Sequence, residues 1–318
     1  MRLENKSLLL TSASSKIPLI VATQNALQRT SPGHKLLIGD TDEKSLAFHF
    51  SPHSWVMPLT DNYNFNLILE GCLKRNVELI LPTRDGELAF FSQYKDEFDS
   101  YGIRVLVSST LGVSRCLDKL LFYDYLQSLN YPVIFTSTKV ENCTGLRFVV
   151  KDRYGSGSIL VKTNLSREDA LRAALSFRNP VIQPMINGRE FSVDVWISQS
   201  GASGVSSVRF RDVILDGEAR VTSTFRDDKI ENLAISMARA IGISGLCVLQ
   251  GFILADKSVL FIECNARVGG ATTASINSGV PLLDLLIADA LKLNVETILK
   301  HFIRRDLKQV RAPFDYCF

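Results

Sequence analysis

Metal-binding and disulfide-forming residues are scarce in this sequence. It has four histidines and six cysteines, and no CxxC pair or Cys/His zinc spacing occurs among them. The cysteines are Cys72, Cys116, Cys143, Cys247, Cys264 and Cys317. Several lie in apolar, strand-like runs, where cysteine behaves as a small buried hydrophobe. We therefore expect reduced, structural thiols, as is usual in the cytosol.

Long apolar runs and a strong charge of one sign are also missing. No stretch of about 18 apolar residues occurs, so a membrane-spanning helix is not expected. The first leucine run soon gives way to polar TSASSK, which argues against a signal peptide. The formal net charge is +3, which disfavours binding to nucleic acid or to anionic membranes. With 46% hydrophobic and 22% charged residues, we expect a soluble, cytoplasmic globular protein.

Short apolar runs alternate with helical patterns in the N-terminal third. The expected strands are Leu8–Leu10, Lys35–Ile38, Val77–Leu81 and Ile103–Val107. This alternation predicts a parallel sheet with helices on both faces. The turn after the first strand, Thr11–Lys16, has no glycine, so the layout is Rossmann-like without the glycines of a dinucleotide site.

Acidic residues follow two of these strands. Asp40, Asp85 and Glu87 come just after expected strand ends, where open α/β sheets bind ligands. Exposed loop carboxylates are also commonly just solvated, so both interpretations stay open.

The pattern changes near residue 110 toward an antiparallel sheet with helices. The expected helices are Asp118–Leu129, Ser166–Leu175, Asp228–Ile241 (ending at Gly242) and Pro281–Leu291. The expected strands are Leu146–Lys151, Ile159–Lys162, Pro180–Met185, Glu190–Ile197, Leu246–Leu254 and Val259–Arg267.

The last of these strands is the most informative segment. Residues two apart share one face of a strand, so Glu263, Asn265 and Arg267 project from the same side. Burying a carboxylate, an amide and a guanidinium together is costly without partners. If a hairpin around Ala255–Ser258 pairs Leu254 with Val259, Gln250 faces Glu263.

Gln250, Glu263 and Asn265 would then offer hard oxygen donors of the kind that Mg²⁺ prefers. Arg267 supplies a fork that suits phosphate. The alternative interpretation is a hydrogen-bonded polar cluster inside a sheet.

Two further segments point to a nucleotide. Lys151 ends an expected strand and precedes Gly155–Ser158, so its ammonium group and the backbone N–H groups of the loop could hold phosphates. Taken alone, such a loop is more often a plain hairpin turn. Gln183-Pro184-Met185 ends an apolar strand whose free backbone groups suit a purine edge. Glu190 could bind ribose hydroxyls or be an ordinary exposed glutamate.

In this order, these segments resemble the ATP-grasp superfamily, closest to the carbamoyl-phosphate synthase large-subunit type, over nearly the whole chain. The specific part is FIECNARVGGAT (261–272) with Gln250 upstream. The resemblance implies an α/β and α+β fold, in which a Rossmann-like pre-ATP-grasp domain precedes a two-lobed ATP-grasp fold. It places the pre-ATP-grasp domain at 1–109, the small lobe with its lead-in helix at 110–186, and the large lobe with the metal site and C-terminal tail at 187–318.

The resemblance also implies residue roles. The nucleotide would be bound by Lys119, Lys151, Gly155, Ser156, Gly157, Ser158, Gln183, Met185 and Glu190. The metal would be bound by Gln250, Glu263 and Asn265, and the catalytic groups would be Arg267, Lys151 and Asn265.

The sequence departs from the family pattern at Ala266 (usually proline), at Pro184 (often acidic) and at Val248 (polar in some members). In some members the polar side chain at the position of Val248 contacts the reaction intermediate. If that role exists here, another residue fills it. The candidates are Arg209, Arg211, Arg220 and Arg226, and a surface-charge role is as open for each.

The implied activity is an ATP-dependent carboxylate–amine ligation through an acyl phosphate, giving ADP and phosphate, with Mg²⁺ or Mn²⁺. Small-molecule acids and amines would be the partners, with no nucleic acid or membrane, and a homodimer is suggested. Only one such unit is present, so the complete carbamoyl-phosphate synthase reaction is not expected. The alternatives are a small-molecule kinase and a non-catalytic ATP-binding regulatory module.

Overall fold

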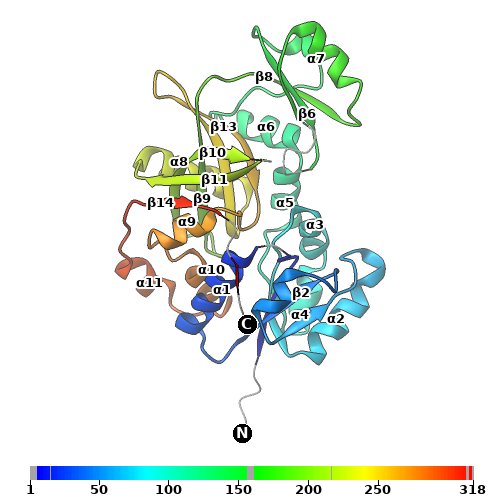
Figure 1. Ribbon diagram of the computed structural model, residues 1–318, viewed down its shortest axis with the longest axis vertical. Coiled ribbons are helices and arrows are strands. Elements are labelled where there is room, and N and C mark those ends of the chain that lie inside the picture. The colour runs from blue at the N-terminus through cyan, green and yellow to red at the C-terminus, as the bar shows by residue number, and fades with distance from the viewer. Residues whose placement is uncertain (1–5, 15, 156–160, 216, 313–314, 317–318) are drawn as a thin grey trace.

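A computed structural model describes residues 6–14, 16–155, 161–215, 217–312 and 315–316. Its elements form three sheets, of five, three and six strands. Figure 1 shows the three-stranded sheet at one end of the molecule and the five-stranded sheet at the other. This is the mixed architecture that the sequence predicts.

The five-stranded sheet belongs to the N-terminal region and has the order β3-β2-β1-β4-β5. Its strands are β1 (Ser7–Thr11), β2 (Lys35–Asp40), β3 (Ser54–Val56), β4 (Val77–Leu81) and β5 (Arg104–Val105), all pairing in parallel. The predicted parallel sheet is thus confirmed. The edge strand β3 was not expected, because three residues carry no readable alternation.

Helices cover both faces of this sheet, as the buried strands require. They are α1 (Ile17–Thr30), α2 (Phe65–Lys74), α3 (Asp85–Gln93) and α4 (Lys95–Ser100), with 3-10 turns at Leu46–Phe50 and Asn62–Asn64. Alternate residues of β1 enter different cores. Leu9 packs in one, whereas Leu8 and Leu10 pack in the other with residues of α1 and of the later helix α10 (Leu282–Ala290).

The three-stranded sheet forms a small lobe with its own core. It has the order β7-β6-β8, with β6 (Phe148–Asp152), β7 (Val161–Leu165) and β8 (Pro180–Pro184), and α7 (Arg167–Ala174) packs on it. The lead-in elements are α5 (Thr110–Leu117), α6 (Lys119–Ser128) and a 3-10 turn at Val140–Asn142. Ser166 caps α7 as predicted, accepting a bond from Asp169 N. Ser156, Gly157 and Ser158 of the expected phosphate loop lie outside the described residues.

The six-stranded sheet is antiparallel and has the order β13-β12-β9-β10-β11-β14. Its strands are β9 (Arg189–Ile197), β10 (Gly204–Leu215), β11 (Glu218–Phe225), β12 (Gly245–Ile253), β13 (Val259–Asn265) and β14 (Lys308–Val310). The remaining helices are α8 (Asp228–Ile241), α9 (Thr272–Asn277) and α11 (Val295–His301). Helix α8 has the predicted bounds and ends at Gly242 with φ 92°. It packs its apolar side on one face of the sheet. The other face carries polar side chains and, under α10, the buried Trp196 and Leu246.

The β12–β13 hairpin brings Gln250 opposite Glu263, as predicted. The predicted pairing of Leu254 with Val259 is wrong by one residue, because Ile253 pairs with Val259. A register shift between Gln250 and Gly251 absorbs the difference. Arg267 also lies beyond the strand, because β13 ends at Asn265 and Arg267 N bonds back to Asn265 O.

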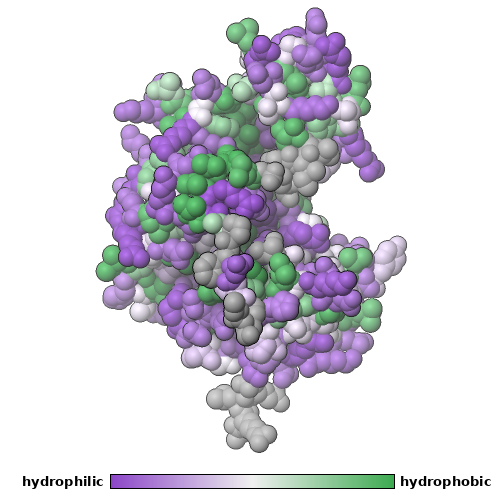
Figure 2. Space-filling view, in the orientation of Figure 1, coloured by the Kyte–Doolittle hydropathy of each residue, from purple (hydrophilic) through white to green (hydrophobic). Residues whose placement is uncertain are grey.

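Among the described residues, no helix combines the length and apolar character that crossing a membrane requires. Cys72, Cys116, Cys143, Cys247 and Cys264 are free and buried, as expected, and Cys317 lies outside the described residues. Figure 2 shows a largely hydrophilic face that is hollowed between the small lobe and the N-terminal region.

Candidate nucleotide and metal site

Gln250, Glu263 and Asn265 meet on the polar face of the six-stranded sheet. Gln250 pairs with Glu263 across the hairpin, and Val248 pairs with Asn265. The Gln250 side chain is already engaged, because its Oε1 accepts a short hydrogen bond from Arg211 Nη1. The predicted pairing of Gln250 with Glu263 is confirmed, whereas a metal-binding role for these residues and Asn265 stays a prediction, and Arg211 is an addition to the group.

Glu190 belongs to the same cluster. Its Oε1 lies 2.6 Å from Arg211 Nη1. Burial raises the pKa of Glu190, Arg211 opposes this rise, and the nearby negative charge of Glu263 adds to it. Two carboxylates thus share one partly buried space, which favours a cation between or beside them.

Lys151 approaches this cluster from the small lobe. It lies on β6 with 5% of its surface exposed. Burial lowers the pKa of Lys151 to about 8, while Glu263 and Glu190 act to raise it and Lys119 to lower it. The predicted phosphate lysine and the predicted metal carboxylate are therefore within electrostatic range of each other, although 112 positions apart in sequence.

Lys119 and the start of the loop after β6 are joined at the head of α6. Asp118 caps the helix by accepting bonds from Leu120 N and Leu121 N. The same carboxylate holds Arg153 through two bonds, Nε–Oδ1 at 2.7 Å and Nη2–Oδ2 at 2.6 Å. Lys119 Nζ donates to Gly155 O at 2.7 Å. The Asp118–Arg153 bond was not predicted, and no local pattern signals a contact between such distant segments.

Gln183 lies on the same side of the small lobe as Lys151. It pairs with Val149, and Lys151 is two residues beyond Val149 on β6. Its side chain is buried, and its Nε2 donates to Thr136 Oγ1 at 2.8 Å. Met185 is 46% exposed, and its N–H bonds to Arg147 O. One N–H of the Gln183 amide is bonded to Thr136, so an adenine contact would come from the second N–H, from Oε1 or from the backbone beyond it.

Arg267 contacts the N-terminal region, a link that the sequence gave no reason to expect. Its Nη2 lies 2.6 Å from Asp85 Oδ2, at the start of α3. The same Nη2 lies 3.5 Å from Asn265 Oδ1. Asp85 therefore has a partner, whereas Glu87 is buried and bonded to Thr11, Ser12 and the backbone N–H groups of residues 83 and 84.

A buried polar network lies under the loop that carries Arg267. Asp194 accepts bonds from Arg209 Nε (2.7 Å), Thr272 Oγ1 (2.5 Å) and Ser275 Oγ (2.6 Å). Thr272 Oγ1 in turn accepts from Gly269 N at 2.9 Å. The network ties the glycine turn and α9 to the sheet. The sequence predicted the strand that carries Asp194 from its alternation of polar and apolar residues, but it did not single out Asp194 itself.

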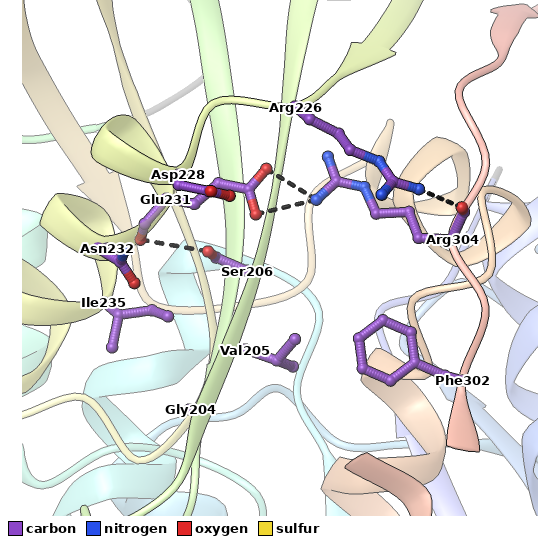
Figure 3. A pocket seen from close by; sticks show the side chains of 10 residues that line it. All are labelled: Gly204, Val205, Ser206, Arg226, Asp228, Glu231, Asn232, Ile235, Phe302 and Arg304. Atoms are coloured by element: carbon purple, nitrogen blue, oxygen red, sulfur yellow. Dashed lines mark hydrogen bonds and ion pairs between the residues drawn. The ribbon is translucent and has the colours of Figure 1, made fainter. Parts of the chain in front are cut away.

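The four candidate arginines occupy different places. Arg211 lies in the cluster and Arg209 in the buried network. Arg220 is 3.8 Å from the exposed Glu218. Arg226 lines a different cavity of about 350 Å³ between α8 and the segment before β14, where its Nη2 bonds to Arg304 O (Figure 3). Of the four, Arg211 has the contacts that best fit a role at the site.

The donor set suits a hard divalent ion. Glu263 supplies a carboxylate, and Gln250 and Asn265 supply amide oxygens, which are the ligands that Mg²⁺ accepts while keeping waters. No group of three or more His, Cys, Asp or Glu with metal-site geometry occurs in the described part of the chain. A metal here would therefore bind through mixed carboxylate and amide ligands, with its remaining positions open to water and phosphate.

Comparison with known families agrees with this geometry. An ATP-grasp domain matches residues 116–271, and a PylC-like N-terminal domain matches residues 8–106. The chain therefore carries an ATP-grasp domain that follows a PylC-like N-terminal domain.

Solved structures share the fold at low identity. An L-amino acid ligase from Bacillus licheniformis aligns with a TM-score of 0.75 at 16% identity, covering 98% of this chain and 81% of that one. The biotin carboxylase domain of a Hydrogenobacter thermophilus 2-oxoglutarate carboxylase was solved as a dimer with MgADP, ADP and bicarbonate. It aligns with a TM-score of 0.73 at 15% identity, covering 90% of this chain and 69% of that one. A Staphylococcus aureus N5-carboxyaminoimidazole synthetase, solved with ADP, aligns with a TM-score of 0.72 at 14% identity, covering 91% of this chain and 78% of that one.

Proposed function

We propose that this protein is an ATP-dependent ligase that joins a carboxylate to an amine, or to a related nucleophile, through an acyl phosphate. The observation that carries this proposal is the approach of Lys151, from the small lobe, to Glu263 and Glu190 on the large lobe. An ammonium group opposite carboxylates, between two lobes, suits a nucleotide triphosphate and its metal ion. Two of the similar structures were solved with ADP, one of them also with MgADP, which supports the same ligands here.

The nucleotide would lie between β6 and β8 of the small lobe and the β12–β13 hairpin. Lys119 and Lys151 would bind phosphate oxygens, Gln183 and the backbone near Met185 the adenine, and Glu190 the ribose. Glu263, Asn265 and Gln250 would hold Mg²⁺, with Gln250 first released from Arg211. A bound Mg²⁺ supplies Lewis-acid charge that stabilises the transferring phosphoryl group.

The reaction balances in two steps. A carboxylate oxygen of the acid bonds to the γ-phosphorus of ATP as the bond to the ADP oxygen breaks. The amine nitrogen then bonds to the acyl carbon, the carbon–oxygen bond to phosphate breaks with its electron pair, and the amine loses a proton. Arg267 lies just beyond β13, where its guanidinium would bind the acyl phosphate.

The domain boundaries and the oligomeric state are also proposals. We place the N-terminal domain at residues 1–109, the small lobe at 110–186 and the large lobe at 187–318. The small lobe would close on the large one. The dimer among the similar structures supports a homodimer for this chain. The closer likeness to carbamoyl-phosphate synthase and the cytoplasmic location stay predictions.

Release of ADP and phosphate tests the activity. The full chain is incubated with Mg²⁺-ATP and with pools of carboxylic acids and amines, separately and together, and products are identified by mass spectrometry. A ligase releases ADP only when both pools are present. A stable phosphorylated acid with no amine requirement would instead establish a kinase, and tight ATP binding without turnover would establish a regulatory module.

A further inference from the structure

A two-pronged ion pair joins the head of α6 to the end of β6. Arg153 Nε and Nη2 lie 2.7 Å and 2.6 Å from the two carboxylate oxygens of Asp118. Burial acts to raise the pKa of Asp118, but the bonds from Arg153 and from the backbone of α6 hold that pKa below its usual range. Because both carboxylate oxygens are held by one planar fork, the pair fixes orientation as well as distance.

The two partners are anchored in different cores. Helix α6 packs against β13 and α8, and its Phe122 and Leu126 belong to the same core as Phe261 of β13. Arg153 directly follows β6, whose Phe148 belongs to the separate core of the three-stranded sheet. Figure 1 shows α6 where this sheet meets the large lobe. The ion pair therefore fastens the three-stranded sheet to a helix that is fixed on the large lobe.

Lys119 is held at both ends by the segment that carries Arg153. Its backbone N–H donates to Arg153 O at 3.2 Å, and its Nζ donates to Gly155 O at 2.7 Å. An ammonium group has three protons, so two stay available for a ligand. Lys119 also lies within electrostatic range of Lys151, whose pKa it acts to lower. Two ammonium groups that repel each other favour a polyanion between them.

The charge of Arg153 is already met by acidic groups. Asp118 neutralises it directly, and Asp124, further along α6, lies within electrostatic range of both residues. The guanidinium group of Arg153 also faces the ring of Tyr154 at 5.3 Å. Arg153 therefore has little charge to offer a phosphate, and its influence on the site passes through Lys119.

We propose that the Asp118–Arg153 pair is a latch that sets the position of Lys119 against the phosphates of ATP, with Arg153 as a positioning residue. Breaking the pair frees residues 153–155, whose carbonyl groups hold Lys119. The ammonium group then loses its fixed position, and ATP loses a charge-assisted contact. This inference rests on the proposed function, because it takes Lys119 as a phosphate ligand.

Equilibrium binding of Mg²⁺-ATP to the full chain, measured by calorimetry, tests the latch without requiring turnover. Arg153→Gln should weaken binding about tenfold, as loss of a charged hydrogen bond predicts. Asp118→Ser should have the same effect, because serine keeps the helix cap but offers Arg153 no charge. Arg153→Lys should recover part of the affinity, because it keeps the charge without the fork.

A double variant and a matched control separate the latch from other roles. If the two residues act as one pair, Asp118→Ser combined with Arg153→Gln should weaken ATP binding no more than either change alone. An additive loss would show that Arg153 binds the phosphates by itself and would overturn the latch. Arg172→Gln is the control, because it breaks an exposed ion pair with Asp169 on α7 and should leave the affinity unchanged. Should Asp118→Ser fail to fold, Arg153→Gln and Arg153→Lys still decide, because Arg153 lies outside the helix.

The outcomes separate this inference from the ligase proposal, because turnover is measured independently. Unchanged ATP affinity in Arg153→Gln, in a chain that releases ADP with both substrate pools, would overturn the latch while the ligase proposal stands. ATP affinity that depends on the pair, in a chain that never turns over, would uphold the latch and refute the ligase. A chain that binds no ATP would overturn both.

Discussion

Arg209 and Asp194 form an ion pair that solvent hardly reaches, with Nε 2.7 Å from Oδ2 and side chains 3% and 0% exposed. Thr272 and Ser275 donate to the same carboxylate. The pair is thus satisfied, but only while both charges are present. Its position under the glycine turn also means that the loop after β13 depends on it.

Replacing Asp194 by Asn should leave the Arg209 guanidinium buried without its counter-charge. We expect a loss of about 3–5 kcal/mol in the free energy of unfolding, measured by chemical denaturation. Asp212→Asn is the control, because Asp212 pairs with an arginine that is 60% exposed, and it should cost less than about 1 kcal/mol. Similar losses in the two variants would contradict this account of the network.

Glu263 can be tested without disturbing the hairpin. Glu263→Gln keeps the shape of the side chain and removes its charge, so the fold and the melting temperature should change little. The rate of ADP release should fall about 100-fold or more, because a metal ligand at the reacting phosphates is lost. Glu70→Gln, on the exposed side of α2, serves as the control. Full activity in Glu263→Gln would remove the metal assignment.

Lys151 predicts a pH dependence of nucleotide binding. Its pKa of about 8 means that the ammonium charge is present at pH 7 and is lost as the pH rises through 8. The Kd for ATP should therefore weaken about tenfold between pH 7.5 and 9. In Lys151→Arg it should stay nearly flat, because a guanidinium keeps its charge. Calorimetry gives both curves, and parallel curves would exclude Lys151 as a phosphate contact.

The same group affects stability in the opposite direction. Below pH 8 Lys151 is charged in the folded and the unfolded chain, and its burial costs free energy. Between about 8 and its ordinary pKa near 10.4, only the unfolded chain binds the proton, so this group makes the folded state more stable as the pH rises. Lys151→Met should remove that contribution, and denaturation at pH 7 and 9.5 measures it. An unchanged difference between the two pH values in Lys151→Met would refute it.

Gly251 holds the hairpin at the metal cluster. A Cβ there would lie 2.4 Å from Leu260 O and 3.1 Å from the Phe191 ring. Gly251→Ala should therefore push β13 away from β12, cost about 1–3 kcal/mol and lower activity by displacing Glu263 from Gln250. Gly33→Ala, where a Cβ would meet nothing within 4 Å, is the matched control. Wild-type stability in Gly251→Ala would show that the strands can separate freely.

Local patterns predicted much of the fold. Helix α8 and strand β4 have the predicted bounds, because periodicity, an aspartate cap and a terminal glycine are all encoded locally. Gln250 and Glu263 could be paired because a short hairpin fixes their register. Strands β10 and β11 were not delimited, although they sit inside the sheet, because their segment mixes polar and apolar residues without clear alternation.

The parts of the site that the sequence did not predict are contacts between distant segments. Asp85 with Arg267, and Asp118 with Arg153, are ion pairs that no spacing rule specifies. Arg211 was one of four arginines, and only its place on β10 distinguishes it from Arg226. Residue types and order predicted the chemistry, whereas the partners depend on how the lobes fold together.

Strand β14 has a consequence for the outer border of the large sheet. It pairs with Val221, Thr222 and Ser223 and so occupies the hydrogen-bonding side of β11 that β10 does not use. A protein shortened before Lys308 would present that row of N–H and C=O groups to solvent, next to the exposed side of β10 with Val213 and Leu215. Such an open border invites strand pairing with a second molecule, so β14 protects this edge of β11 from unspecific strand addition.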